Sequence, residues 1–193
     1  MAPQWNGAFL FFAGSSLAGK LQVQEKVYIT KYNPYYDRYI CLVPEENVRD
    51  ILTKHLEKTT KLLSDIPEQR ANYRYASGKW SLKEVLGHIT DNERIMSYRL
   101  LRIARGDKTP LAGYNQDDFI RGSSFDSHKL SELIEDYMFV RRSTLTLLRG
   151  LSEEAWSRRG FVNNSELSVK ALAYIIAGHE LHHIKVIKEK YLV

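Results

Sequence analysis

The sequence predicts an all-α protein whose four long helices form one bundle. Three observations support this class. Four long segments repeat apolar residues with the 3.6-residue period of an amphipathic helix, Gly and Pro separate these segments, and no strand-like alternation competes with them. The chain of 193 residues, 44% of them hydrophobic, has the size of one ordinary domain with a sizeable core. We expect a domain over residues 31–193 after a loosely ordered N-terminal extension of residues 1–30.

The first predicted helix covers about residues 45–65 and carries a histidine on its apolar stripe. The stripe consists of Val48, Ile51, Leu52, Thr59 and Leu62. His55 lies at its centre. The sequence offers no partner for this imidazole at metal-ligand spacing, so we interpret His55 as a core residue.

The second predicted helix covers residues 81–105 and opens with a capping box. Ser81 is followed three residues later by Glu84, which is the signature of a helix N-terminus. His88 falls inside the apolar arc of this helix and should therefore face other helices. Glu93 falls close to the same arc, and a buried carboxylate there needs a partner such as an arginine or a tyrosine.

The third predicted helix covers residues 127–149, after a long connection. Residues 106–126 form a longer join than two antiparallel neighbours in a bundle require. We therefore predict that this segment crosses over the bundle and that the second and third helices run parallel. The topology would then be up-down-down-up. A short helical turn carrying Trp156 should follow Ser152.

The fourth predicted helix covers residues 168–190 and carries two more inward-facing histidines. Its inward arc contains Leu172, Ile175, Ile176, His179, His183 and Val186. Two imidazoles at i and i+4 project their nitrogens toward a common point, which is typical of half a metal site. Two ligands rarely hold a catalytic metal, so a third is needed, and His88 is the best candidate. The sequence therefore predicts a site for a divalent metal formed by His88, His179 and His183; the alternative is a hydrogen-bonded polar core.

A second apolar strip on the fourth helix consists of Ala173, Ala177, Leu181 and Ile184. Small residues allow another helix to approach closely. We predict that this strip forms a homodimer contact, although a helix of the same chain could also cover it.

Composition excludes several classes of function. The net charge of +5 comes partly from arginines spread along the helices, without an aromatic-rich basic patch, so we expect no nucleic-acid partner. No apolar run is long enough to span a membrane. The chain has a single cysteine, Cys41, so it cannot form an internal disulfide. This suits the reducing cytoplasm. We interpret Cys41 as a small, partly buried residue. The segment 14–20 resembles a phosphate-binding loop, but Leu21 replaces the required Ser or Thr.

Two segments carry a resemblance to a known family. Residues 78–89, GKWSLKEVLGHI, and residues 177–183, AGHELHH, resemble the DinB-like superfamily, with RIARGD at 102–107 between them. The resemblance implies an up-down-down-up four-helix bundle that is often dimeric. It also implies that His88, His179 and His183 hold a divalent metal, commonly nickel or zinc. Family members are described as metal-dependent hydrolases, and the best characterised branches are transferases that use the thiols bacillithiol, mycothiol or glutathione.

The leading functional hypothesis is a metal-dependent enzyme acting on a small molecule, such as a low-molecular-weight thiol. Three neutral histidines would leave a coordination position open for a thiolate or water, and they accept zinc, nickel or iron. Glu180 and Asp91 are candidates for orienting a ligand or accepting a proton. A non-catalytic metal-binding bundle is the alternative. A zincin peptidase, with Glu180 as the base of a His-Glu-x-x-His motif, is disfavoured because only ten residues follow His183.

Overall fold

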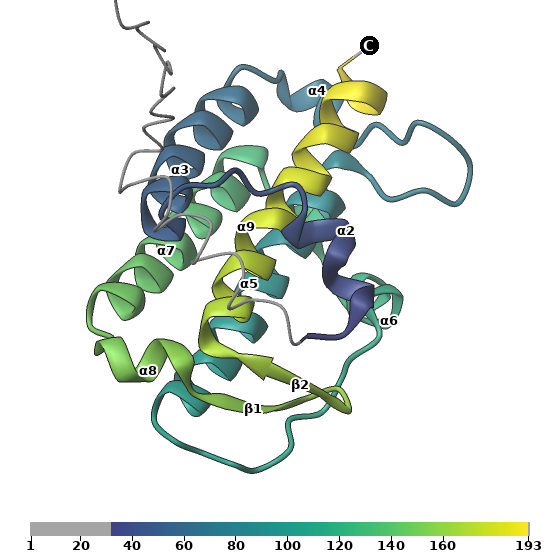
Figure 1. The fold of residues 1–193 in the computed structure, drawn as a ribbon. Helices are drawn as coiled ribbons and strands as arrows, with labels where there is room; N and C mark the ends of the chain where they lie inside the picture. Colours follow the sequence, from purple (N-terminus) through teal and green to yellow (C-terminus); the bar gives the residue numbers. More distant parts are fainter. Residues whose placement is uncertain (1–31, 193) are drawn as a thin grey trace, which may run out of the picture.

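The computed structural model describes residues 32–192, which fold into a mainly helical bundle (Figure 1). The long helices are α3 (Val48–Ser64), α5 (Leu82–Ala104), α7 (Leu130–Arg149) and α9 (Val169–Val186). A π-helical segment, Ile187–Tyr191, continues α9. The prediction of an all-α four-helix bundle is confirmed, and the helix boundaries differ from the predicted ones by only a few residues. The predicted extension of residues 1–30 and the loop-like segment 14–20 lie outside the described residues.

Short elements connect and flank the bundle. They are the 3-10 turn Pro34–Tyr36, α2 (Asp37–Ile40), α4 (Glu68–Ala71), α6 (Gln116–Arg121), the 3-10 turn Phe125–Ser127 and α8 (Glu153–Ser157). Helix α8 carries Trp156, as predicted. The capping box of α5 is also present, since the side chains of Ser81 and Glu84 each bind the other residue's backbone N–H. Local sequence signals therefore place these helix starts correctly.

A β-hairpin that the helical pattern of the sequence did not indicate precedes α9. Strands β1 (Arg159–Val162) and β2 (Ser165–Ser168) pair antiparallel. The two residues between them, Asn163 and Asn164, both have positive φ, which is what a tight hairpin turn requires. Four-residue strands are too short to produce a convincing period of two, so the turn residues were the available signal.

The direction of each long helix follows from two clusters of buried side chains. Leu86 and Leu133, near the starts of α5 and α7, belong to one cluster. Leu100 and Leu148, near the ends of the same helices, belong to the other. Helices α5 and α7 therefore run in the same direction, while α3 and α9 contribute to the clusters in the opposite order. This placement agrees with a crossover through the segment between α5 and α7.

The small-residue strip of α9 packs inside the chain. Ala173 and Ala177 are fully buried, in one cluster with side chains of the N-terminal turns. Helix α2 lies against α9 (Figure 1). The backbone carbonyl of Tyr39 approaches Gly178 closely. The small residues of the strip are thus covered by the same chain. They therefore give no support to the predicted homodimer contact. Cys41, at the end of α2, is exposed and not partly buried.

Substituting Gly178 with alanine should destabilise the protein. A Cβ atom there would lie 2.1 Å from the carbonyl oxygen of Tyr39, so backbone would have to move. Overpacking of this kind costs about 1–3 kcal/mol, and we expect that loss in urea unfolding. Gly122→Ala is the matched control because its Cβ would meet nothing closer than 3.4 Å. Equal stability of the two variants would contradict the close approach of α2 and α9.

Among the described helices, none combines the length and the hydrophobicity that a membrane span needs.

Candidate metal centre

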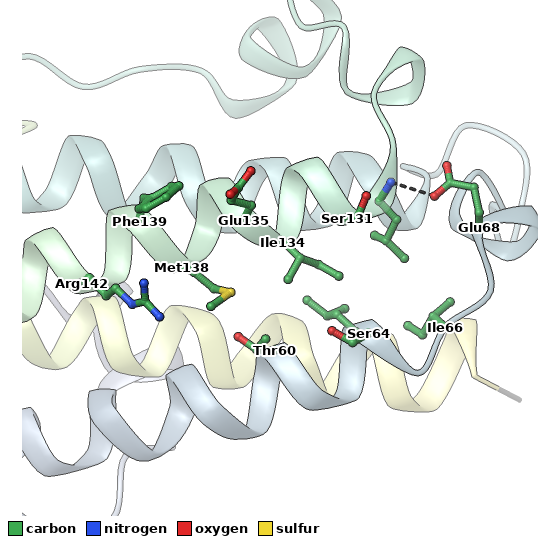
Figure 2. Close-up of a pocket in the computed structure, with 12 residues that line it drawn as sticks. Thr60, Ser64, Ile66, Glu68, Ser131, Ile134, Glu135, Met138, Phe139 and Arg142 are labelled. Carbon is green, nitrogen blue, oxygen red and sulfur yellow. Dashed lines mark hydrogen bonds between the residues drawn. The ribbon is translucent and has the colours of Figure 1, made fainter.

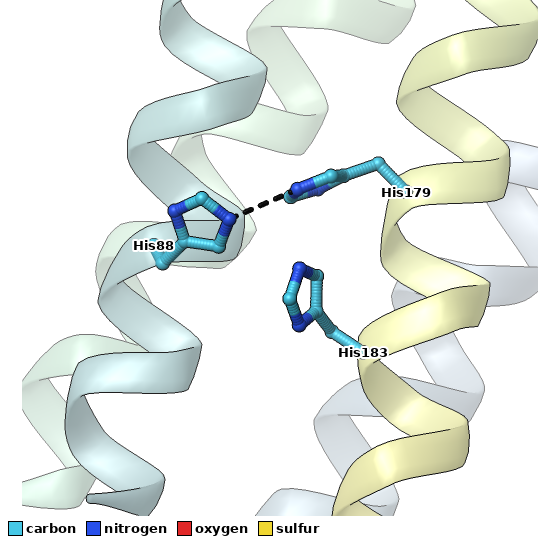
Figure 3. A group of neighbouring side chains, drawn as sticks. All are labelled: His88, His179 and His183. Atoms are coloured by element: carbon cyan, nitrogen blue, oxygen red, sulfur yellow. Dashed lines mark hydrogen bonds between the residues drawn. The ribbon is translucent and has the colours of Figure 1, made fainter. Parts of the chain in front are cut away.

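Three histidines from two helices converge in the interior of the bundle (Figure 3). His88 comes from α5, and His179 and His183 come from successive turns of α9. Their candidate ligand nitrogens all lie within 4.8 Å of one another, and the Nε2 atoms of His88 and His179 are 3.0 Å apart. The structure thus brings together the three side chains that the sequence predicted as metal ligands.

The surroundings keep these imidazoles neutral. His88 and His179 are buried. Burial lowers the pKa of His88 to about 4, and burial together with the nearby imidazoles lowers the pKa of His183 to about 3. Burial also holds the pKa of His179 well below its usual range. Neutral imidazoles present the lone pairs that a divalent metal requires, so no proton has to be displaced at neutral pH.

The geometry of the donor set fits a divalent metal. Zinc–imidazole bonds of about 2.0–2.1 Å in a tetrahedral site place two ligand nitrogens about 3.3 Å apart. The 3.0 Å separation between His88 and His179 is close to that value. Aromatic rings fix the imidazoles in place: Trp80 lies 4.9 Å from His88, and Tyr39 lies 5.2 Å from His179, between ring centroids. The limit of 4.8 Å for the whole set exceeds the tetrahedral spacing, so the three rings would have to move closer together to hold one ion.

A pocket of about 680 Å³ opens next to the histidines. It is lined by Tyr35, Tyr36, Tyr39, Asn92, Met96, Arg99, Gly113, Tyr114, Asn115, Gln116, Asn163, Ile175 and His179. His179 belongs both to the pocket wall and to the histidine cluster. A small molecule in this pocket would therefore reach one side of the cluster.

The pocket combines segments that are distant in the sequence. The connection between α5 and α7 supplies Tyr114, and the hairpin turn supplies Asn163. These two connections, which lie on either side of α7 in the sequence, therefore meet at the pocket wall. The tyrosines of the N-terminal turns were missed, because short 3-10 turns have no periodic pattern. The dense aromatic run around Tyr35 and Tyr36 was the signal that could have found them.

Glu180, a candidate proton acceptor, faces away from the histidine cluster into a buried polar network. Its carboxylate accepts hydrogen bonds from Thr59, Tyr137 and Arg141, at 2.7, 2.6 and 2.8 Å. Its Oε2 atom also lies 3.1 Å from Nδ1 of His55. The carboxylate of Glu180 is thus held in a buried network away from the histidine cluster. In a zincin site it would have to face the metal as the base, so the geometry does not fit that alternative. His55, interpreted from the sequence as an unpaired core residue, has a partner 125 residues away.

Two other carboxylates also find arginine partners. Glu93 forms a bidentate pair with Arg141, as the need for an arginine or tyrosine partner predicted. Asp91, the second candidate proton acceptor, receives a hydrogen bond of 3.3 Å from Arg94. Burial raises the pKa of Asp91. Neither residue belongs to the histidine cluster, and the role of Asp91 as a proton acceptor stays a prediction.

A second pocket, of about 490 Å³, lies between α3 and α7 (Figure 2). Ile134, Met138 and Phe139 give it an apolar wall, and Glu68 accepts a hydrogen bond from the backbone N–H of Leu130 at its edge. None of its lining residues comes from α5 or α9, which carry the histidines. It is therefore separate from the candidate metal centre.

The fold and the site together define a class of protein, namely a helical bundle that builds a metal site from side chains of facing helices. The model of the DinB superfamily matches residues 51–187. The chain belongs to this superfamily.

Individual relatives agree with this membership. A protein of Oceanobacillus iheyensis, named "Putative metal-dependent hydrolase OB0413", is 26% identical over 182 residues, which cover 88% of this chain and 91% of that protein. YfiT from Bacillus subtilis, whose structure is described as a probable metal-dependent hydrolase with an unusual four-helix bundle topology, superposes with a TM-score of 0.65 at 16% identity. That match covers 74% of this chain and 82% of YfiT.

A mycothiol-dependent maleylpyruvate isomerase superposes with a TM-score of 0.61 at 13% identity. The match covers 75% of this chain and 61% of the isomerase. At this level of identity, both structural matches show a shared fold.

Proposed function

We propose that this protein is a metal-dependent enzyme that acts on small molecules. His88, His179 and His183 would hold a divalent metal, with zinc or nickel as the leading candidates. The observation that carries the proposal is the shared position of His179, which belongs to the histidine cluster and also lines a large pocket. Structural metal sites are closed by protein ligands, whereas catalytic sites keep a position open for water or substrate.

The protein's own groups suit this chemistry. The three imidazoles are neutral, and those of His88 and His179 are buried, so they can bind a cation away from bulk water. A bound divalent metal would lower the pKa of a thiol or water beside it and so supply a nucleophile at neutral pH. Burial raises the pKa of Tyr39 to about 12 and also raises that of Tyr114. Both hydroxyls therefore stay protonated at neutral pH and can donate hydrogen bonds to a substrate.

The relatives favour two versions of the reaction. The name of the Oceanobacillus protein and the description of the YfiT structure refer to metal-dependent hydrolases, in which water is the nucleophile. The isomerase depends on mycothiol, a low-molecular-weight thiol. We propose a hydrolase or a thiol S-transferase that works in the reducing cytoplasm. Neither version requires a catalytic cysteine, and exposed Cys41 is not among the residues that line the pocket.

The direct test starts from metal content. Protein purified without a histidine tag should contain about one divalent metal ion per chain by elemental analysis. Metal-loaded protein is then screened with low-molecular-weight thiols against electrophiles and, separately, with esters and amides. In the transferase version a sulfur–carbon bond forms while the leaving group departs and the thiol proton passes to solvent. Turnover that requires both the metal and the three histidines would support the proposal.

Removing the metal should lower the thermal stability of the protein. A ligand that binds only the folded state stabilises it by about 2.7 kcal/mol at a concentration one hundred times its dissociation constant. We therefore expect the melting temperature to fall by several degrees after chelation and to recover when zinc or nickel is added back. An unchanged melting temperature would indicate that the cluster holds no ion.

The alternative is a bundle in which the metal only joins α5 to α9. It predicts the same loss of stability on chelation but no turnover. Metal-dependent stability without conversion of any thiol, ester or amide would therefore favour the structural alternative.

A further inference from the structure

Arg99 lies in the wall of the pocket that reaches His179, and it is almost completely buried, at 4% exposure. Its guanidinium donates to the backbone carbonyl of Ala112 and contacts the sulfur of Met96 at 3.6 Å. It also lies 5.7 Å from the centroid of the Tyr114 ring. These contacts hold the side chain in place but do not neutralise its charge.

The other arginines that flank it on α5 are paired. Arg94 forms an ion pair with Asp136, and Arg102 forms one with Asp107. For Arg99 no ion pair with a carboxylate is found within residues 32–192, and burial lowers the pKa of its guanidinium. A buried charge without a counter-charge is costly, and arginine stays protonated in proteins. The side chain is therefore set up to receive an anion.

Asn92 supplies a second unsatisfied group in the same wall. Its Nδ2 atom donates to the hydroxyl of Tyr114 at 2.7 Å, but its buried Oδ1 atom receives no hydrogen bond from the described residues. Buried polar atoms are normally paired, so an acceptor left open in a pocket wall indicates a donor supplied by a ligand or by water. The pocket thus offers both a cation and an acceptor.

The spacing along α5 places these groups in a row. Eleven residues separate His88 from Arg99, and at about 1.5 Å per residue their Cα atoms lie roughly 16 Å apart along the helix. Helical side chains lean toward the helix N-terminus, so the guanidinium lies nearer the histidines than its Cα atom does. Asn92 occupies the interval, four residues after His88. A ligand of roughly 10 Å in length would reach from the side of the histidine cluster, past Asn92, to Arg99.

We propose that the pocket binds an elongated small molecule whose carboxylate pairs with Arg99 while its reactive end lies beside His179. Asn92 would accept a hydrogen bond from the middle of the molecule. A carboxylate is favoured over a phosphate because one guanidinium supplies one charge and, among residues 32–192, no other Arg or Lys lines the pocket. In the described part of the chain, no Asp or Glu lines it to repel an anion. The placement of the reactive end beside His179 rests on the proposed function. The pairing of the carboxylate with Arg99 does not depend on that function.

Two matched probe pairs test the proposal. Zinc-loaded protein is titrated with 6-mercaptohexanoate and with 6-mercaptohexanamide, and metal-free protein is titrated with hexanoate and hexanamide. Calorimetry or ligand-observed NMR gives the dissociation constants. We expect each acid to bind about tenfold more tightly than its amide, because a charge-assisted hydrogen bond is lost in the amide.

Variants assign this preference to one residue. Arg99→Met should bring the ratio of acid to amide affinity close to one, and Arg99→Lys should keep part of the preference. Arg105→Met removes the same charge from an exposed position on the same stretch of chain and should leave the ratio unchanged. A purely structural role of Arg99 in holding Ala112 would weaken both probes equally and leave the ratio intact, which would overturn the proposal.

The two probe pairs also separate this inference from the proposed function. If hexanoate is preferred on metal-free protein but the thiol probes gain nothing from zinc, the carboxylate subsite stands and the thiol version of the function fails. If neither acid is preferred over its amide in the wild-type protein, the assignment of Arg99 is wrong, whatever the metal content.

Discussion

Replacing His179 with alanine is expected to abolish stoichiometric metal binding. His179 is the ligand candidate that lies 3.0 Å from His88, and it shares the cluster with His183 one helical turn away. Loss of partners that only orient ligands already weakens metal affinity about 10- to 100-fold, so loss of a direct ligand should cost more than that. The measurement is the metal content after dialysis, together with the dissociation constant from competition with a chelating dye.

The control for this experiment is His128→Ala. His128 is exposed and lies at the start of the third long helix, outside the histidine cluster. Circular dichroism should show helical content near that of the wild type in both variants. If His179→Ala unfolds, His88→Ala probes the same site from α5. Retention of one ion per chain in a folded variant of either ligand would rule out the three-histidine site.

Replacing Arg141 with methionine is expected to be the most destabilising change away from the histidines. Arg141 is fully buried between Glu93 and Glu180, whose side chains are each 2% exposed, and it forms ion pairs with both. Burial favours loss of its proton, but the two carboxylates hold the pKa of Arg141 well above its usual value. Removing one member of a buried ion network leaves uncompensated charge and costs about 3–5 kcal/mol. Chemical denaturation measures this loss as a lower midpoint.

Two further variants show whether charge is the cause. Arg142→Met changes the neighbouring, exposed arginine and should shift stability by no more than about 0.5 kcal/mol. Adding Glu93→Gln and Glu180→Gln to Arg141→Met removes both unpaired charges, so part of the lost stability should return. If the triple variant is no more stable than Arg141→Met alone, lost packing, and not buried charge, accounts for the effect.

The two experiments probe neighbouring faces of the same turn of α9. His179 faces α5 and the pocket, whereas Glu180 contacts α3 and α7 through Thr59 and Arg141. The polar network therefore holds α9 in the orientation that presents the histidines to His88. We expect Arg141→Met to weaken metal binding as well, though less than the loss of a ligand.

Much of the fold and the metal site could be predicted from short-range sequence patterns. The periodic apolar residues gave the four helices, and the spacing of Ser81 and Glu84 gave the start of α5. His179 and His183 lie one turn apart on any helix, so their common direction follows from helix geometry alone. The inward position of His88 followed from the apolar arc around it. The hairpin was missed because its strands are shorter than the window in which a period can be recognised.

The sequence by itself determined which segments become helices and which of their faces turn inward, because those properties depend on residues within one or two turns of each other. Only the tertiary structure decided the partners: His55 and Arg141 for Glu180, α2 for the small residues of α9, and, for Arg99, a pocket position with no carboxylate partner among the described residues. A helical period shows that a side chain is buried but not what it meets. Contacts between residues a hundred positions apart depend on how whole helices pack and on the course of the connections between them.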